Sequence, residues 1–133
     1  MEKNLREELV RQAMAAREFA YVPYSNYRVG AAVVSNEGKI YSGCNIENAS
    51  YGLTNCAERT ALFNAISQGD KSFAGLAVAV DGKLPASPCG ACRQVIREFF
   101  ADDTEIILLS EEGEAIVTSI KELLPGAFTD KYM

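Results

Sequence analysis

The sequence predicts an α/β domain in three layers, with helices on both faces of a mixed, five-stranded central sheet. Two strand-like stretches, 28–35 and 39–46, are separated by the short turn Asn-Glu-Gly, which is typical of an antiparallel hairpin. After this hairpin, helical and strand patterns alternate, as expected for parallel strands joined by crossover helices. The length of 133 residues and the 48% hydrophobic content fit one domain spanning 1–133.

The first half of the chain is expected to contain two helices around the hairpin. Apolar residues recur at helical spacing over 4–20, and Pro23 then marks a loop before the first strand. The strands at 28–35 and 39–46 form the hairpin. A second helix is expected over 56–69, with Asn55 as its cap and Gly69 as its stop.

The second half is expected to add three strands and two helices. The run 73–80 is continuously apolar, which indicates a buried strand. A helix over 89–100 follows, then strands at 104–110 and 115–118. A last helix at 119–125 ends at Pro125.

Charge and composition exclude several classes of function. The net charge is −5 and no cluster of lysine and arginine occurs, so binding to nucleic acid or to an anionic membrane surface is disfavoured. No apolar run is long enough to span a bilayer, and the first residues lack the apolar stretch of a secretion signal. We therefore expect a cytoplasmic protein that binds neither nucleic acid nor membrane.

Three cysteines mark a candidate metal site in a chain that contains no histidine. Cys56 lies at the start of one predicted helix, and Cys89 and Cys92 lie in the first turn of another. Helix N-termini stabilise thiolates, and thiolates are the form of cysteine that binds metal. Three of them suit one Zn²⁺ ion per chain, by softness and by tetrahedral geometry.

The fourth zinc position decides between catalysis and structure. A water molecule there would make a catalytic site, whereas Cys44 would close a structural one. Glu58, two residues after Cys56, favours catalysis because it can exchange protons with that water; alone, it would be an ordinary first-turn acid. Arg59 and Arg93 are candidates to hydrogen-bond the sulfurs, Arg59 being favoured, with ordinary surface arginines as the alternative.

The pattern C-x-E followed by P-C-x-x-C is that of zinc deaminases. Nearly end to end, the chain resembles the small, homotetrameric cytidine deaminases, in "VPYSNYRVGAAV", "GCNIENASYG", "NCAERTAL", "SPCGACRQV" and "ELLPGAF". The resemblance implies a cytidine deaminase-like fold and hydrolysis of cytidine and 2′-deoxycytidine to uridine and 2′-deoxyuridine, with release of ammonia, in pyrimidine salvage. It implies that hydroxide on zinc attacks C4 while Glu58 shuttles protons.

The resemblance also implies residues that bind the nucleoside. Asn45 and Glu47 match residues that bind the ribose 3′-hydroxyl, and Glu47 would repel a phosphate there; the alternative is that both residues only cap a loop. Backbone around Ala57 and Cys89 would hydrogen-bond the base. Tyr27 stands where relatives commonly have phenylalanine against the pyrimidine ring, and the next residue, Arg28, replaces a frequent proline.

Three further residues match positions that relatives share between subunits. Ala49, Tyr51 and Phe128 are expected to reach a neighbouring active site, which implies a homotetramer; for Tyr24, Tyr51 and Phe128, packing alone is the alternative. Three rival functions stay open: a structural zinc module closed by Cys44, a deaminase of another cytosine-like substrate such as an antibiotic, and a C-x-x-C redox protein.

Overall fold

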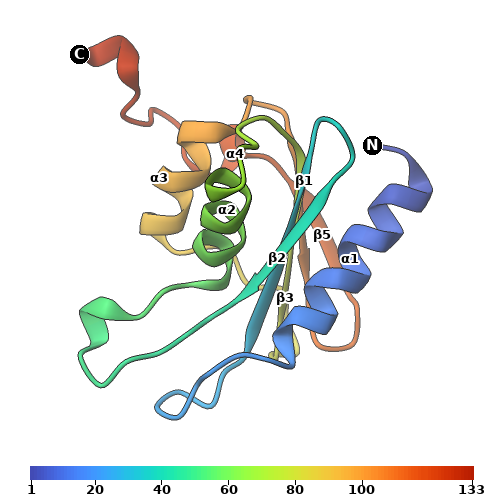
Figure 1. The fold of residues 1–133 in the computed structure, drawn as a ribbon, viewed down its shortest axis with the longest axis vertical. Coiled ribbons are helices and arrows are strands. Elements are labelled where there is room, and N and C mark those ends of the chain that lie inside the picture. The colour runs from blue at the N-terminus through green and yellow to red at the C-terminus, as the bar shows by residue number, and fades with distance from the viewer.

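The computed structural model describes residues 1–133, which form one mixed five-stranded sheet with helices on both faces (Figure 1). The strands are β1 (Val29–Ser35), β2 (Ile40–Cys44), β3 (Phe73–Val80), β4 (Glu105–Leu109) and β5 (Ala115–Thr118), and the helices are α1 (Lys3–Arg17), α2 (Ala57–Ser67), α3 (Gly90–Phe99) and α4 (Ile120–Leu123). The predicted three-layer fold is confirmed. None of the helices has the length and hydrophobicity needed to span a bilayer.

The strand order is β2-β1-β3-β4-β5. The predicted hairpin is confirmed, since β1 pairs antiparallel with β2, and β1 also pairs antiparallel with β3. The parallel pairing expected for strands joined by a crossover helix is confirmed for β3 and β4, with α3 between them in the chain. β5 pairs antiparallel with β4, because a tight turn closed by Ser110 and Glu114 joins them instead of a helix.

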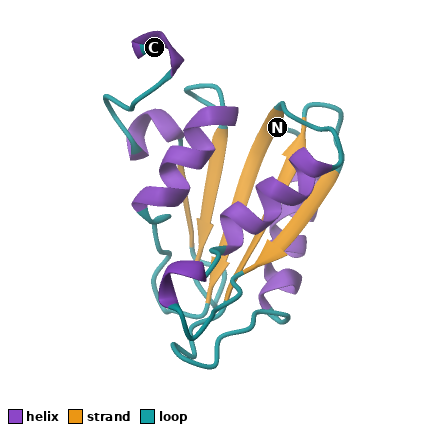
Figure 2. Ribbon diagram, turned by 60° about the vertical axis from the view of Figure 1, so that its left-hand side comes forward, coloured by secondary structure: helices purple, strands orange, loops and turns teal.

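The sheet separates two apolar clusters, and β3 is buried on both of its faces, as predicted. Leu76 and Val78 pack with α2, α3 and α4, whereas Ala77 and Ala79 pack with α1 on the other face. Figure 2 shows α1 and the pair α2 and α3 on opposite sides of the strands. The side of the sheet covered by α2 and α3 is the one that bears the candidate metal site.

The start of α2 differs from expectation and its end agrees. Cys56, not Asn55, is the N-cap residue, and no side chain caps the helix. A β-bridge to Ile46 holds the Asn55 backbone outside the helix, one residue before the N-cap position. The side-chain amide of Asn55 donates to the Thr60 hydroxyl at 2.9 Å. Gly69 has φ +101° directly after the C-cap residue, so it ends the helix as predicted.

Two glycines let helices approach the hairpin from opposite faces. A Cβ on Gly30 would lie 2.1 Å from the Ala13 carbonyl oxygen of α1, and a Cβ on Gly43 would lie 2.5 Å from the Ala61 nitrogen of α2. Gly30 pairs with Cys44 in the sheet, and directly paired residues share a face. Cys44 therefore lies on the α1 side.

We expect Gly30→Ala to lower the free energy of unfolding by about 3 kcal/mol, because the added methyl group overlaps the backbone of α1. Urea denaturation followed by circular dichroism measures this change. Gly52→Ala is the control, since a Cβ there meets no atom within 4 Å. Equal stability of Gly30→Ala and wild type would show that α1 can move away without loss.

Candidate active site

Two helix starts bring the three cysteines together. Cys56 is the N-cap residue of α2, and Cys89 is the N-cap residue of α3. Each accepts the first backbone hydrogen bond of its helix, from Thr60 at 3.0 Å and from Arg93 at 2.9 Å. The N-cap residue and the residue three positions later lie on the same side of a helix, which is why Cys89 and Cys92 point the same way.

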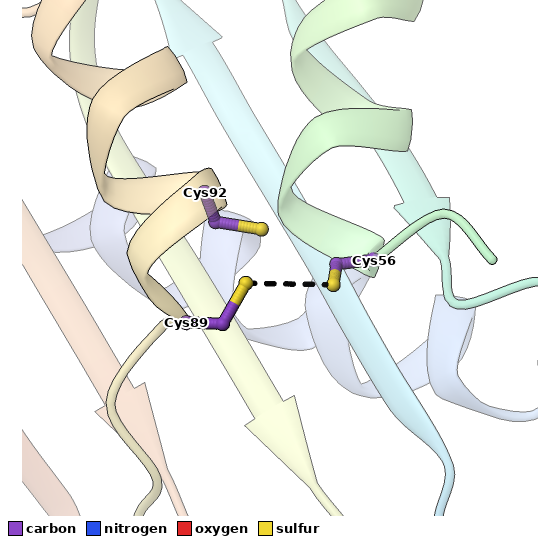
Figure 3. Close-up of side chains that lie close together, drawn as sticks. All are labelled: Cys56, Cys89 and Cys92. Carbon is purple, nitrogen blue, oxygen red and sulfur yellow. Dashed lines mark hydrogen bonds between the residues drawn. The ribbon is translucent and has the colours of Figure 1, made fainter. Parts of the chain in front are cut away.

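The sulfur atoms have the spacing that a zinc ion requires. The Sγ atoms of Cys56, Cys89 and Cys92 all lie within 4.8 Å of one another, and those of Cys56 and Cys89 are 3.8 Å apart (Figure 3). Tetrahedral zinc with Zn–S bonds of about 2.3 Å separates its sulfur ligands by about 3.8 Å. The cluster therefore fits zinc, the cofactor that the cysteines predict.

Cys44 is not part of this cluster. Its pairing with Gly30 puts it on the α1 face, so the sheet lies between its sulfur and the starts of α2 and α3. Burial raises the pKa of its thiol, as expected for a small apolar side chain. Closure of a structural four-cysteine site by Cys44 is therefore excluded.

Negative charge in the cluster is favoured on the Cys56 sulfur. Hydrogen bonds from Cys92 and from Arg59 lower the pKa of Cys56 to about 5, and Arg59 Nη2 lies 3.3 Å from the sulfur. The hydrogen bond with Cys56 and burial together raise the pKa of the Cys92 thiol. The pKa of Arg59 is raised by the same contact, so this guanidinium stays cationic and offsets thiolate charge.

Glu58 is a buried carboxyl group in the first turn of α2. Only 5% of its surface is exposed, and burial raises its pKa to about 7, with a further contribution from the charge of Cys56. It lines the same cavity as Cys56 and Cys89. A carboxyl group with a pKa near neutrality can both accept and release a proton in such a cavity.

The cavity beside the sulfurs has a volume of about 160 Å³. Several residues proposed from the sequence line it, together with apolar side chains of the sheet and of the loop before α3. The lining residues are Tyr27, Val29, Asn45, Cys56, Ala57, Glu58, Val78, Val80, Ala86, Ser87 and Cys89. Sequence reasoning missed Val29, Val78, Val80, Ala86 and Ser87, because their meeting depends on the assembled sheet and not on a local motif.

Asn45 and Glu47 hold the loop that precedes β1. The Asn45 amide donates to the Tyr27 carbonyl at 3.0 Å and accepts from the Val29 amide at 2.9 Å. Glu47 accepts from the backbone of Tyr24 and Ser25, and from the Ser25 hydroxyl. It lines a neighbouring hollow of about 380 Å³ and not the cavity of Glu58.

Ala49, Tyr51 and Phe128 lie outside the cavity of Glu58. Tyr51 is 75% exposed and meets Tyr24 edge-on at 6.0 Å, while Phe128 is 61% exposed and stacks on Tyr132. The C-terminal segment that carries Phe128 extends away from the sheet (Figure 1). Ala49 and Phe128 line neither this cavity nor the hollow at Glu47, whereas Tyr51 lines the hollow at Glu47 in its own chain.

Arg93 has a role that neither sequence-based alternative described. Its Nε donates to the Pro88 carbonyl and its Nη1 donates to the Leu123 carbonyl, both at 2.7 Å. It therefore holds the backbone before Cys89 against the end of α4 and does not bond a sulfur. The contact to Leu123 spans 30 residues, so no local signal announces it.

Residues 3–108 match the family model of the cytidine and deoxycytidylate deaminase zinc-binding region. A cytidine deaminase of Halalkalibacterium halodurans is 52% identical over 96% of this chain and 97% of its own length. One of Sporosarcina psychrophila is 53% identical over 92% and 90%. The crystal structure of cytidine deaminase from Burkholderia pseudomallei superposes with a TM-score of 0.89 at 52% identity, covering 96% of this chain and 100% of that one.

We expect Cys44→Ser to retain about one zinc ion per chain and Cys92→Ser to lose it, because Cys92 belongs to the three-cysteine cluster and Cys44 does not. Inductively coupled plasma mass spectrometry on purified, dialysed protein measures the content. Circular dichroism checks that both variants are folded. Loss of zinc from Cys44→Ser would contradict the three-sulfur site.

Proposed function

Because the chain belongs to the cytidine and deoxycytidylate deaminase family, we propose that it is a zinc-dependent enzyme that hydrolyses cytidine and 2′-deoxycytidine to uridine and 2′-deoxyuridine, releasing ammonia. The observation that carries the proposal is the buried Glu58 carboxyl group, which shares one small cavity with Cys56 and Cys89. A structural zinc site has no use for a buried acid beside its ligands, because the acid costs free energy of desolvation.

The proposed chemistry assigns each residue at the sulfurs a task. Cys56, Cys89 and Cys92 hold the ion as thiolates, and Arg59 balances their charge. When bound, zinc supplies a Lewis acid that makes water nucleophilic near neutral pH. Glu58 accepts a proton from the water that attacks C4, delivers it to N3, and passes another to the amino group. The C4–O bond forms as N3 takes its proton and the N3–C4 double bond becomes single. The C4–N bond to the amino group then breaks as the proton of the new hydroxyl reaches that nitrogen, so that ammonia leaves and a C4–O double bond remains.

The remaining residues would bind the nucleoside. Tyr27 packs against the base, and backbone groups around Ala57 and Cys89 hydrogen-bond it. Asn45 lines the cavity, and Glu47 lies in the adjoining hollow, which suits a base in the first and a sugar in the second. Ribose and deoxyribose carry the same 3′-hydroxyl, and this is the sugar group that the site would bind, so both nucleosides are substrates.

The assembly belongs to the same proposal. Residues 1–133 act as one catalytic domain, and four chains form a homotetramer in which Ala49, Tyr51 and Phe128 reach neighbouring sites. The exposed aromatic rings of Tyr51 and Phe128 support this, because large exposed aromatic side chains are typical of interfaces. The enzyme works in pyrimidine salvage in the cytoplasm and binds neither nucleic acid nor membrane.

Glu58→Gln should lower kcat for cytidine by about 10³-fold and leave zinc content unchanged, since the amide keeps the shape but cannot accept a proton. The fall in absorbance on conversion of cytidine to uridine measures kcat. Metal analysis of the same preparation is the control. Turnover within about threefold of wild type would refute the role of Glu58 as proton carrier.

Cytidine 3′-phosphate should have a kcat/KM at least about tenfold below that of cytidine, because its phosphate would face the Glu47 carboxylate. The pKa of Glu47 is lowered by its hydrogen bond with Ser25, so it is anionic at neutral pH. Glu47→Gln should bring the kcat/KM values for cytidine and cytidine 3′-phosphate closer together. An unchanged ratio in this variant would show that Glu47 does not face the 3′ position.

A further inference from the structure

Asp81 forms an extensive ion pair with Arg28 where β1 begins and β3 ends. Its carboxylate accepts from the Arg28 backbone nitrogen and Nε, each at 2.9 Å, and from Nη2 at 3.2 Å. The Asp81 amide donates back to the Arg28 carbonyl at 3.0 Å. A two-pronged contact between guanidinium and carboxylate fixes orientation as well as distance. The two residues are therefore held as one rigid unit.

The same unit is anchored to α1 on the far face of the sheet. Arg17, the last residue of α1, donates to the Val80 carbonyl at 2.8 Å and places its Nε 3.8 Å from Asp81. Glu18 pairs with Arg28 at 2.6 Å. Two cations thus face two anions, and the charges balance around Asp81.

Each partner of the pair adjoins a different wall of the cavity. Tyr27 precedes Arg28 and forms the first of these walls, whereas Gly82 follows Asp81 and begins the loop that supplies Ala86 and Ser87, the second wall. The two walls touch at this point, because a Cβ on Gly82 would lie 3.4 Å from Tyr27 Oη. The carboxylate of Asp81 therefore lies at the junction of the two walls and outside the cavity.

We propose that Asp81 is a positioning residue: through Arg28 it holds the Tyr27 ring against the loop at 82–88 and so sets the width of the substrate pocket. The inference rests on the proposed function, in which Tyr27 packs against the base. Loss of the pair lets the two walls separate. The base then binds less tightly, while the sulfurs and Glu58 keep their positions and the chemical step keeps its rate.

Asp81→Asn tests this, because the amide keeps the size of the side chain and removes its charge. We expect KM for cytidine to rise about tenfold, about 1.4 kcal/mol of binding. We expect kcat to change less than about twofold and zinc content to stay at one ion per chain. A fall in kcat with KM unchanged would overturn the inference. Arg28→Gln removes the other partner of the pair, whose side chain is the more exposed of the two. This variant should give the same result, and it serves as the test if Asp81→Asn folds poorly.

A double-mutant cycle with Tyr27 separates positioning from general stabilisation. If Asp81 acts through the ring, Asp81→Asn has less than about a twofold effect on KM in a Tyr27→Ala background. Additive effects on KM would overturn the inference. Glu105→Gln is a matched control, since the Arg6–Glu105 pair is also two-pronged and its side chains have exposures of 43% and 19%, against 40% and 19% for Arg28 and Asp81. This control should leave KM unchanged.

A readout without turnover separates this inference from the proposed function. If wild type converts no cytidine, the proposed function fails, and crystal structures of wild type and Asp81→Asn then decide. A Tyr27 ring displaced from Gly82 in the variant supports the positioning role. A ring that stays in contact with Gly82 overturns it.

Discussion

The convergence of two helix N-termini on one point is the constraint on which the site depends. Cys56 and Cys89 are both N-cap residues, so each sulfur lies where free backbone N–H groups and the helix dipole favour negative charge. Arg59 adds a full positive charge beside Cys56. The Cys56 thiolate is therefore stabilised before any metal is considered. The buried Glu58 lies beside it because both residues belong to the start of α2.

The sheet decides which groups can meet. Gly30 and Gly43 allow α1 and α2 to approach the β1–β2 hairpin from opposite sides. Alternation along β2 then puts Cys44 on the α1 side, away from the other three cysteines. Long side chains also connect the helices to the ends of the strands, as Arg17 does when it reaches from α1 to the Val80 carbonyl at the end of β3.

Local features were predictable from the sequence, and features set by distant contacts were not. The C-x-x-C spacing, the apolar run of β3 and the stop at Gly69 follow from short-range geometry. The cap at Asn55 was wrong because a bridge to Ile46 displaces this residue. The antiparallel pairing of β5, the anchoring by Arg93 and the contact between Gly82 and Tyr27 each need the assembled fold, so no spacing within the chain announces them.

The Ser25 hydroxyl links the two halves of the proposed binding site. It accepts a hydrogen bond from the Tyr27 amide and bonds the Glu47 carboxylate, so one side chain connects the loop at the base to the group at the sugar. Ordering the segment at Tyr27 restrains the segment at Glu47, and the reverse also holds. A ligand that contacts both segments therefore loses this conformational entropy only once. On the proposed roles, a nucleoside gains more affinity than its separate base and sugar together, and such cooperativity by itself favours intact nucleosides over free cytosine.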